Sequence, residues 1–370
     1  MKKISSLVLG LESSCDDTAA AILRYTKDDN LGGIEILSSI VLNQNSLHQE
    51  FRGVVPEIAA RAHSERLDFC TKKALTEAGT HIEDISLISV SAGPGLVGGL
   101  LSGIMFAKGL AKGLDCPVLG INHLAAHCLS VKMIHSIDFP YLTLLASGGH
   151  CQFLIVEGFD KFLRLGGTID DAPGECFDKV AASLGLGYPG GPEIEKHSLK
   201  GNKNRFPFPR PMMDKLDSNM SFSGLKTAVK RKIDEIIRVQ GGLYPKDIND
   251  ICASFQNSIV EIFRKKSEFA MNEFNNYYGL EKNNYALVGG VAANKEIRKT
   301  LEKVASNNKF EFFSVPQKFC TDNAAMIAYL GSQKFITGNY TKEELIPKPR
   351  WPLDINAKPM LGFGKRGVKA

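Results

Sequence analysis

The chain has 370 residues, of which 44% are hydrophobic and 23% charged, and its formal net charge is +5 at pH 7. This composition excludes a disordered or low-complexity chain, and the length suits two domains better than a single core. The mildly basic charge permits a nucleic-acid partner but does not predict one without a local basic patch.

The first half of the chain predicts a sheet flanked by helices. Residues 6–11, 18–25 and 34–42 are apolar stretches of strand length, and the polar turn ESSCDD separates the first two. A helical pattern extends from Pro56 to Ala78, opened by a proline at a position that helices tolerate. A strand with a glycine turn, a helix of small residues and another strand follow at 85–95, 96–114 and 117–121.

The second half repeats this plan. Residues 141–158 read as strand, glycine turn and strand, and they match residues 6–23 in type and length. A third strand, a helix and two strand–helix pairs follow at 162–168, 170–185, 285–304 and 310–335. The duplication predicts an α/β protein of the actin-like/Hsp70-like (ASKHA) ATPase type, with two mixed-sheet lobes and helices around a central nucleotide cleft.

The domain boundaries follow from this duplicated plan. We expect an N-terminal actin-like lobe over 1–138, a C-terminal actin-like lobe over 139–345 and a C-terminal tail over 346–370. The second lobe is expected to carry a basic helical insertion at about 200–260. Its loop KGNKNRFPFPRPMMDK places Phe206 and Phe208 among lysines and arginines, which is compatible with nucleic-acid contact or with a solvated loop.

The cysteines and the N-terminal stretch bear on the compartment. Eight cysteines are scattered without a CxxC pair, which is typical of a reducing compartment. MKKISSLVLGLESSC is expected to form a buried strand rather than a signal peptide, because Ser5, Ser6 and Glu12 interrupt its apolar run. No apolar run is expected to reach the length of a membrane span, so we expect a cytoplasmic protein without membrane contact.

The stretch NHLAAHCL is the strongest candidate for metal chemistry. His123 and His127 are four residues apart, so both imidazoles would lie on one face of a helix. The spacing is that of the HExxH motif of zinc proteases, but Leu124 stands where a protease needs its glutamate base.

Asp322 begins the helix that corresponds to NHLAAHCL in the second half, so the two helix starts would face each other across the cleft. Two histidines and one carboxylate suit Fe(II) or Zn(II) and leave coordination positions open. The alternative is that His127 is a surface histidine and that Asp322 only caps its own helix.

Glycine-rich turns directly follow two strands of the second half, at SGGH (147–150) and GGVAAN (289–294). Glycines let backbone N–H groups approach phosphate oxygens, and a following helix N-terminus adds positive potential. Two such turns in matched positions predict nucleotide binding, although the sequence has no GxxxxGK[ST] motif. Asp178 and Glu195 lie near these turns, either as ordinary surface charges or as hydrogen-bond partners of a ribose or a polar substrate.

Ten motifs in order identify the chain as resembling the bacterial TsaD (Gcp) family. The resemblance covers residues 7–345 approximately. The motifs are ESSCDDT, EFRGVVPEIAARAHSERL, SAGPGLVGGL, NHLAAH, SGGH, DDAPGECFDK, YPGGP, SFSGLKT, GGVAAN and CTDNAAMIA. The resemblance implies transfer of the threonylcarbamoyl group of threonylcarbamoyl-AMP to the exocyclic amine of an adenosine in tRNA, with release of AMP. That adenosine is immediately 3′ of the anticodon, at tRNA position 37, in tRNAs that read ANN codons.

The resemblance also implies site residues. His123, His127 and Asp322 would hold one divalent metal ion per subunit, Fe²⁺ in first place and Zn²⁺ as the alternative, and would act in catalysis through it. Threonylcarbamoyl-AMP or ATP/ADP would bind in the cleft. The residues that fall on the family's substrate and nucleotide contacts are Leu145, Ala146, Ser147, Gly148, Gly149, Asp178, Gly191 and Asn294, with Glu195 nearby.

The implied partners are tRNA, a paralogous TsaB-type subunit, a TsaE-type small ATPase and a separate synthase that supplies threonylcarbamoyl-AMP. Three other functions compete with this one. A metal-dependent glycoprotein endopeptidase, the family's older label, lacks the glutamate base, and a small-molecule kinase of the same fold has no need of a histidine pair. A non-catalytic paralogue is expected to have lost the metal ligands, which are all present here.

Overall fold

The computed structural model describes residues 4–27, 33–51, 53–338 and 344–358. The chain divides into two units, and each contains two separate stretches of sequence. The first unit comprises Met1–Ser136 and Thr321–Leu353 (with Ala370), and the second comprises Ile137–Cys320 and Asp354–Lys369.

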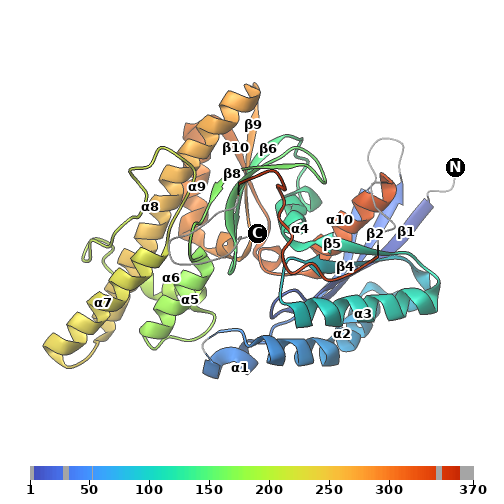
Figure 1. Cartoon of the computed structure of the whole chain (residues 1–370), viewed down its shortest axis with the longest axis horizontal. Helices are drawn as coiled ribbons and strands as arrows, with labels where there is room; N and C mark the ends of the chain where they lie inside the picture. The colour runs from blue at the N-terminus through green and yellow to red at the C-terminus, as the bar shows by residue number, and fades with distance from the viewer. Residues whose placement is uncertain (1–3, 28–32, 52, 339–343, 359–370) are drawn as a thin grey trace. The chain divides into compact units, whose positions relative to one another are not determined.

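The first unit contains a five-stranded mixed sheet, made of β1 (Ile4–Glu12), β2 (Thr18–Lys27), β3 (Gly33–Leu42), β4 (Ile85–Gly93) and β5 (Val118–Asn122). Its strand order is β3-β2-β1-β4-β5, and β1, β2, β4 and β5 are labelled in Figure 1. β1, β2 and β3 form the predicted antiparallel meander, and β4 and β5 extend the sheet in parallel on the other side of β1. The carboxyl ends of β1, β4 and β5 therefore meet at one edge, where ligand sites of such sheets lie.

The helices of the first unit are α1 (Asn45–His48), α2 (Pro56–Ala78), α3 (Val97–Leu114), α4 (His123–Leu129) and α10 (Ala324–Ile336). α2 and α3 lie along each other and pack on the sheet, and α10 packs on β1, β2 and β4. Successive side chains of a strand point to opposite faces, and β1 follows this rule. Leu9 and Leu11 belong to the core shared with α2 and α3, whereas Gly10 faces α10.

The placement of α10 differs from the expected lobe of residues 139–345. Close backbone contacts explain it: a Cβ on Gly10 would lie 2.2 Å from the carbonyl oxygen of Ala324, and one on Gly331 would lie 1.8 Å from Ser89 Oγ. Only glycine lets the helix approach the strands this closely. The expected tail is also divided, since Lys348 N donates to the carbonyl of Ala92 at 2.7 Å in the first unit, while residues 354–358 belong to the second.

α3 contradicts the expectation that no apolar run reaches membrane-span length. Among the described residues, α3 is the one helix that is long and apolar enough, by length and composition alone, to cross a membrane. One side of α3, with Gly99, Leu100 and Ile104, is buried against the sheet and α2, and this accounts for part of its apolar composition.

The second unit repeats the topology of the first. Its strands are β6 (Tyr141–Ala146), β7 (Cys151–Val156), β8 (Phe162–Gly167), β9 (Asn283–Val288) and β10 (Phe310–Ser314). The order is β10-β9-β6-β7-β8, with an antiparallel β6-β7-β8 meander and β9 and β10 added in parallel. Counted from the first strand, the two sheets have the same connectivity, so the predicted duplication of architecture is confirmed.

The helices of the second unit are α5 (Pro173–Ser183), α6 (Gly190–Ser198), α7 (Ser223–Gln240), α8 (Pro245–Tyr278) and α9 (Lys295–Asn307). α6 and α9 both pack on α8, and α5 packs on α6 and α7. The expected helical insertion at about 200–260 corresponds to a loop, α7 and the first half of α8. Short 3₁₀ helices complete the chain at Gln49–Phe51, Ile82–Asp84, Ser130–Met133, Gly290–Ala293 and Gln317–Phe319.

Candidate metal centre and active site

Both candidate histidines lie on the short helix that follows β5. Asn122 caps α4, its side-chain oxygen accepting hydrogen bonds from Leu124 N at 2.9 Å and Ala125 N at 3.1 Å. The helix thus begins at His123, and one turn later His127 lies beside it, with 4.6 Å between the ring centroids. Both side chains are buried, which rules out the surface-histidine alternative.

Asp322 lies one residue before the cap of α10. The cap is Asn323, whose side chain accepts a hydrogen bond from Met326 N at 3.0 Å, so the alternative in which Asp322 only caps this helix is wrong. Asp322 Oδ1 instead lies 3.0 Å from His127 Nε2 and 3.4 Å from His123 Nε2. Asp322 was expected to approach the histidines from the opposite half, but it belongs to their own unit because α10 packs on the first sheet.

The spacing of these three side chains fits one metal ion. Among the described residues, His123, His127 and Asp322 form a group of metal-ligating side chains whose donor atoms all lie within 4.8 Å of one another. Ligands held about 2.0–2.2 Å from one metal, at angles of roughly 90–110°, lie about 3.0–3.4 Å apart. The carboxylate oxygen has these separations from both Nε2 atoms. Two imidazoles and one carboxylate suit Fe(II) or Zn(II) and leave positions for a substrate.

Glu12, the last residue of β1, lies on the other side of the His123 ring. Its Oε2 is 2.9 Å from His123 Nδ1, and its Oε1 accepts a hydrogen bond from Ser14 N at 2.6 Å. Ser14 Oγ lies 3.2 Å from the same ring nitrogen. His127 differs, since its buried Nδ1 has no hydrogen-bond partner among the described residues.

Carboxylates around the histidines create a negative potential that favours a cation. Burial raises the pKa of Asp322, but His123 and His127 outweigh it and hold that pKa far below its usual range. Burial lowers the pKa of His123, but Glu12 and Asp322 outweigh it and raise the pKa well above the ordinary value. Burial, with repulsion from Asp322, raises the pKa of Asp17 to about 8. A divalent cation would relieve this repulsion between carboxylates.

The predicted substrate contacts lie in the second unit. Leu145 and Ala146 end β6 with buried side chains, so they can meet a ligand only through their backbone. Ser147 opens the turn, and Gly148 and Gly149 are exposed, with open space where a Cβ would stand. Bare backbone of this kind suits contact with a phosphate oxygen.

The start of α5 supports this turn. Ser147 N donates to the carbonyl of His150 at 2.8 Å, which closes the turn. Glu175 N donates to the carbonyl of Gly148 at 3.1 Å, and a Cβ on Gly174 would lie 2.7 Å from Gly148 Cα. Glycine at 174 therefore lets α5 lie directly against the turn.

Asp178 has a structural partner in this structure. Its Oδ1 accepts a hydrogen bond from Gly190 N at 2.7 Å, which ties α5 to the start of α6. A Cβ on Gly190 would clash with α5, whereas Gly191 faces open space. Asp178 thus positions the first turn of α6, where Gly191 is accessible.

Glu195 and Asn294 join α6 to the start of α9. Glu195 Oε1 accepts a hydrogen bond from Lys295 N at 2.7 Å. Asn294 caps α9 by accepting from Ile297 N at 3.0 Å, and its Nδ2 donates to Gln256 Oε1 on α8 at 2.8 Å. The structure therefore brings these two predicted residues together.

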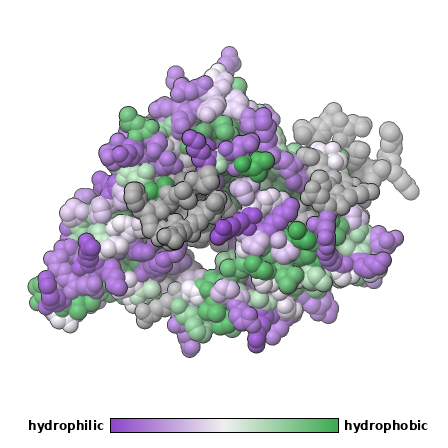
Figure 2. Space-filling view, viewed as in Figure 1, coloured by the Kyte–Doolittle hydropathy of each residue, from purple (hydrophilic) through white to green (hydrophobic). Residues whose placement is uncertain are grey.

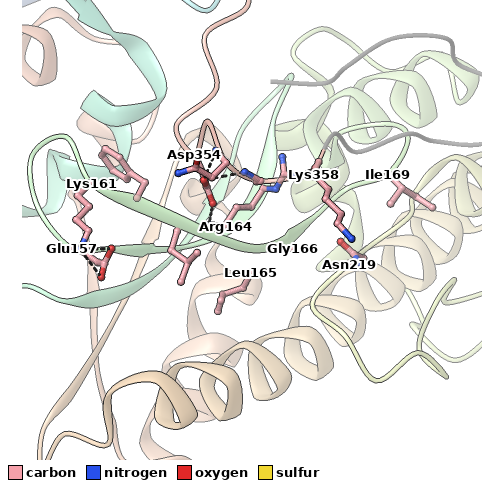
Figure 3. A pocket seen from close by; sticks show the side chains of 13 residues that line it. Glu157, Lys161, Arg164, Leu165, Gly166, Ile169, Asn219, Asp354 and Lys358 are labelled. Atoms are coloured by element: carbon pink, nitrogen blue, oxygen red, sulfur yellow. Dashed lines mark hydrogen bonds and ion pairs between the residues drawn. The ribbon is translucent and has the colours of Figure 1, made fainter.

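Two pockets lie in the second unit. One, of about 450 Å³, opens beside Glu195 between α6, α8 and α9, and Gln256 and Lys295 help to line it. The larger, of about 650 Å³, is lined mainly by residues of β8 and by residues 354–358 (Figure 3). There Asp354 Oδ2 accepts a hydrogen bond from Arg164 N at 2.9 Å. The larger pocket contains none of the predicted site residues.

Some side chains of the basic loop of residues 200–215 form contacts within the second unit and are not free to bind a partner. Arg205 forms ion pairs with Asp247 at 2.7 Å and Asp250 at 2.8 Å, and Phe208 is buried. The exposed cations of the insertion include several on α7, over which hydrophilic side chains gather in the view of Figure 2. They are Lys230, Arg231 and Arg238.

Glu12 and Gln256 were not among the predicted site residues. The available signal for Glu12 was a carboxylate at the carboxyl end of an apolar strand, a position where a buried charge needs a partner. Gln256 carried no such signal, because it lies inside a long helix without a distinguishing motif.

Comparisons with known proteins agree on one family. The family model described as "TsaD: tRNA N6-adenosine threonylcarbamoyltransferase" matches residues 35–329. Curated proteins named tRNA N6-adenosine threonylcarbamoyltransferase are similar over their full length. Those from Ruegeria pomeroyi and Paracoccus denitrificans are 50% and 51% identical, over 98% of both chains. One from Jannaschia sp. is 52% identical over 99% of both chains.

Solved structures show the fold. HypF from T. kodakarensis is 16% identical with a TM-score of 0.55, covering 94% of this chain and 49% of that one. The activator of 2-hydroxyisocaproyl-CoA dehydratase from Clostridium difficile is 17% identical with a TM-score of 0.50, covering 91% and 99%. These likenesses confirm the predicted ASKHA-type fold.

Proposed function

The chain belongs to the TsaD family of tRNA N6-adenosine threonylcarbamoyltransferases, and on that premise we propose which of its residues carry out the reaction. It is a transferase that modifies an adenosine of tRNA. The donor is threonylcarbamoyl-AMP and the acceptor is the exocyclic amine of adenosine 37 in tRNAs that read ANN codons. The amine nitrogen forms a bond to the carbamoyl carbon, the bond from that carbon to the phosphate oxygen breaks, and AMP leaves.

Because the donor is an activated acyl phosphate, the protein needs no nucleophile of its own. We propose that His123, His127 and Asp322 hold one divalent metal ion, Fe²⁺ in first place and Zn²⁺ as the alternative. A bound metal ion would stabilise the charge that develops on the carbamoyl oxygen and bind the threonine carboxylate or hydroxyl. The burial of both histidines keeps bulk water away from these ligands. The proton of the amine would leave to water or to the substrate phosphate.

The second unit would hold the adenylate. Gly148 and Gly149 are exposed, with open space where a Cβ would stand, and we propose that their backbone N–H groups bind its phosphate oxygens. Leu145, Ala146 and Ser147 set the position of this turn, and Asp178 sets that of the α6 turn through Gly190.

The nucleoside part would meet α6 and α9. Gly191, Glu195 and Asn294 supply an accessible backbone, a carboxylate and an amide for it. The hydrogen bond from Lys295 N to Glu195 supports this assignment, because it holds α6 against the start of α9.

The observation that carries the proposal is the buried His123–His127–Asp322 group in a chain that is 50–52% identical to named transferases over its full length. The test is transfer of threonylcarbamoyl from its adenylate to unmodified tRNA, read by nucleoside mass spectrometry with and without partner proteins. The modified nucleoside is expected, and chelator treatment should remove it. No modified nucleoside under any partner combination would reject the proposal.

The competing reactions are disfavoured by the same residues. Peptide hydrolysis would need a base beside the first histidine, and Leu124 at that place is fully buried in the core. Phosphoryl transfer to a small acceptor has no use for the histidine pair.

We also propose a cytoplasmic location and assembly with a paralogous TsaB-type subunit and a TsaE-type small ATPase, with a separate synthase supplying the donor. A row of apolar side chains on α3 supports a protein partner: Val97, Leu101 and Met105 are 55%, 46% and 58% exposed. At spacings of four residues they lie on one helix face, and protein interfaces bury such rows. Aspartate at Leu101 and Met105 should abolish co-purification with the paralogous subunit and leave metal content unchanged.

A further inference from the structure

Glu12 is a fully buried carboxylate at the end of the central strand β1. Side chains alternate along a strand, so Glu12 points to the same face of the sheet as Gly10, the face that α10 covers. His123 and Asp322 lie on this face too. The sheet therefore directs a carboxylate at the metal-binding histidines from the side opposite Asp322.

Both oxygens of Glu12 have partners that fix the side chain. Oε1 accepts a hydrogen bond from Ser14 N at 2.6 Å, two residues further along the chain. Oε2 lies 2.9 Å from His123 Nδ1. A carboxylate can only accept at that contact, so Nδ1 of His123 carries hydrogen both in the protonated ring and in the neutral ring that can bind a metal.

The opposite edge of the His123 ring faces Asp322, with Nε2 lying 3.4 Å from Asp322 Oδ1. A ring nitrogen can bind a metal only through a free lone pair. With the hydrogen held at Nδ1, the lone pair of Nε2 is directed towards the shared ligand position.

We propose that Glu12 is a positioning residue of the metal centre, which fixes the tautomer and the ring orientation of His123 so that Nε2 is the ligand atom. Carboxylates that hold the second nitrogen of a ligating histidine typically change metal affinity by about 10–100-fold. The Nδ1 atom of His127 has no hydrogen-bond partner among the described residues, so only one of the two histidines is held by a carboxylate in this way. The inference rests on the proposed metal site.

The experiment measures metal affinity, not turnover. Metal-free protein is titrated with Co²⁺, followed by visible absorption, and with Zn²⁺ in competition with a chromophoric chelator. Glu12→Ala should weaken binding by about 10–100-fold, and Glu12→Gln, which retains a neutral acceptor, by a smaller factor. The matched control is Glu35→Gln, an exposed carboxylate on β3 of the same sheet, whose affinity should equal that of the wild type.

A spectroscopic measurement on the wild type keeps the proposal testable if the variants do not fold. In Zn²⁺-loaded protein labelled with ¹⁵N-histidine, long-range ¹H–¹⁵N spectra should show one histidine coordinated through Nε2, with a slowly exchanging proton on Nδ1. Couplings from the ring to assigned backbone resonances of the wild type identify this histidine as His123.

The outcomes separate the two proposals. If the wild type binds neither metal, the metal site and the role of Glu12 both fail. If the wild type binds metal tightly and folded Glu12→Ala binds it equally well, only the role of Glu12 is overturned. Coordination of His123 through Nδ1 would overturn that role as well.

Discussion

The turns that follow the first strand of each sheet occupy the same place in the duplicated topology but have opposite constructions. After β1, Ser13 and Ser14 are buried in the unit: Ser13 N donates to Ser91 Oγ at 3.2 Å, and Ser13 Oγ donates to the carbonyl of Gly99 at 3.0 Å. After β6, Gly148 and Gly149 are exposed and face open space. The first turn lies beside the proposed metal ligand His123, whereas the second presents a bare backbone.

The position of the glycines explains the difference. In the second unit they lie in the turn itself, so backbone N–H groups are accessible to a ligand. In the first unit they lie on α3, where a Cβ on Gly99 would stand 2.3 Å from the carbonyl oxygen of Ser13 and one on Gly103 would stand 2.2 Å from its Oγ. The helix thus packs directly against Ser13 at the start of the first turn.

The largest expected effect tests whether the first unit serves metal binding. Asp322→Ala should remove stoichiometric metal and lower threonylcarbamoyl transfer at least about 100-fold, the scale of losing one electrostatic stabiliser. Metal analysis and nucleoside mass spectrometry check this, with Glu35→Ala as the exposed-carboxylate control. Full activity of a metal-free Asp322→Ala protein would remove the metal from the mechanism.

A glycine substitution on α3 tests the closed turn. Gly99→Ala places a methyl group against the backbone of Ser13, so the free energy of unfolding should fall by about 1–3 kcal/mol. On the same helix, a Cβ on Gly109 meets nothing within 4 Å, and Gly109→Ala should gain up to about 1 kcal/mol. Urea denaturation measures both variants. Equal effects would mean that α3 does not hold the turn.

A glycine-to-alanine substitution in the turn after β6 should weaken substrate binding without lowering the stability of the fold. Gly148→Ala adds a methyl group in open space, so stability should change by less than about 0.5 kcal/mol. The methyl would crowd an approaching phosphate, and KM for the adenylate should rise on the order of 10-fold. Steady-state kinetics with thermal denaturation separates the two. An unchanged KM would argue against a phosphate at this turn.

The smallest expected effect concerns His63, which supports the first turn from α2. Its Nε2 lies 3.1 Å from the carbonyl of Cys15, and its Nδ1 lies 2.8 Å from Thr18 Oγ1. His63→Gln should cost roughly 1–2 kcal/mol at neutral pH, the scale of one or two hydrogen bonds.

Burial lowers the pKa of His63, so its neutral form is favoured in the folded state. Its contribution to stability is therefore present above the unfolded pKa of about 6.5 and is lost as the pH falls below that value. The stability difference between wild type and His63→Gln should shrink between pH 7.5 and pH 5.5. Exposed His81→Gln serves as the control, and a difference independent of pH would contradict this account.

Periodicity and spacing predicted much of the molecule. The helix Pro56–Ala78 was confirmed to the residue, because its proline and its following glycine mark both ends. The pairing of His123 with His127 depends on one helical turn, which is local information. The duplicated series of strands and helices followed from two similar series of apolar stretches.

The remaining features depend on contacts between distant parts of the chain. Glu12 and His123 are 111 positions apart, and neither alone indicates that β1 ends against α4. α10 was assigned to the second lobe because duplication suggests that each half keeps its own helices. The close approach of Gly10 and Ala324 instead places α10 on the first sheet, and no local sequence pattern predicts this contact.

The discontinuous first unit also sets a time order during synthesis. Residues up to Ser136, with both histidines, leave the ribosome long before α10 and Asp322 do. Until then the face of β1, β2 and β4 that α10 covers has no helix of its own, and domains fold as complete units. A nascent chain therefore carries His123 and His127 without Asp322, and the proposed metal centre of the first unit is complete only after Asp322 has been made.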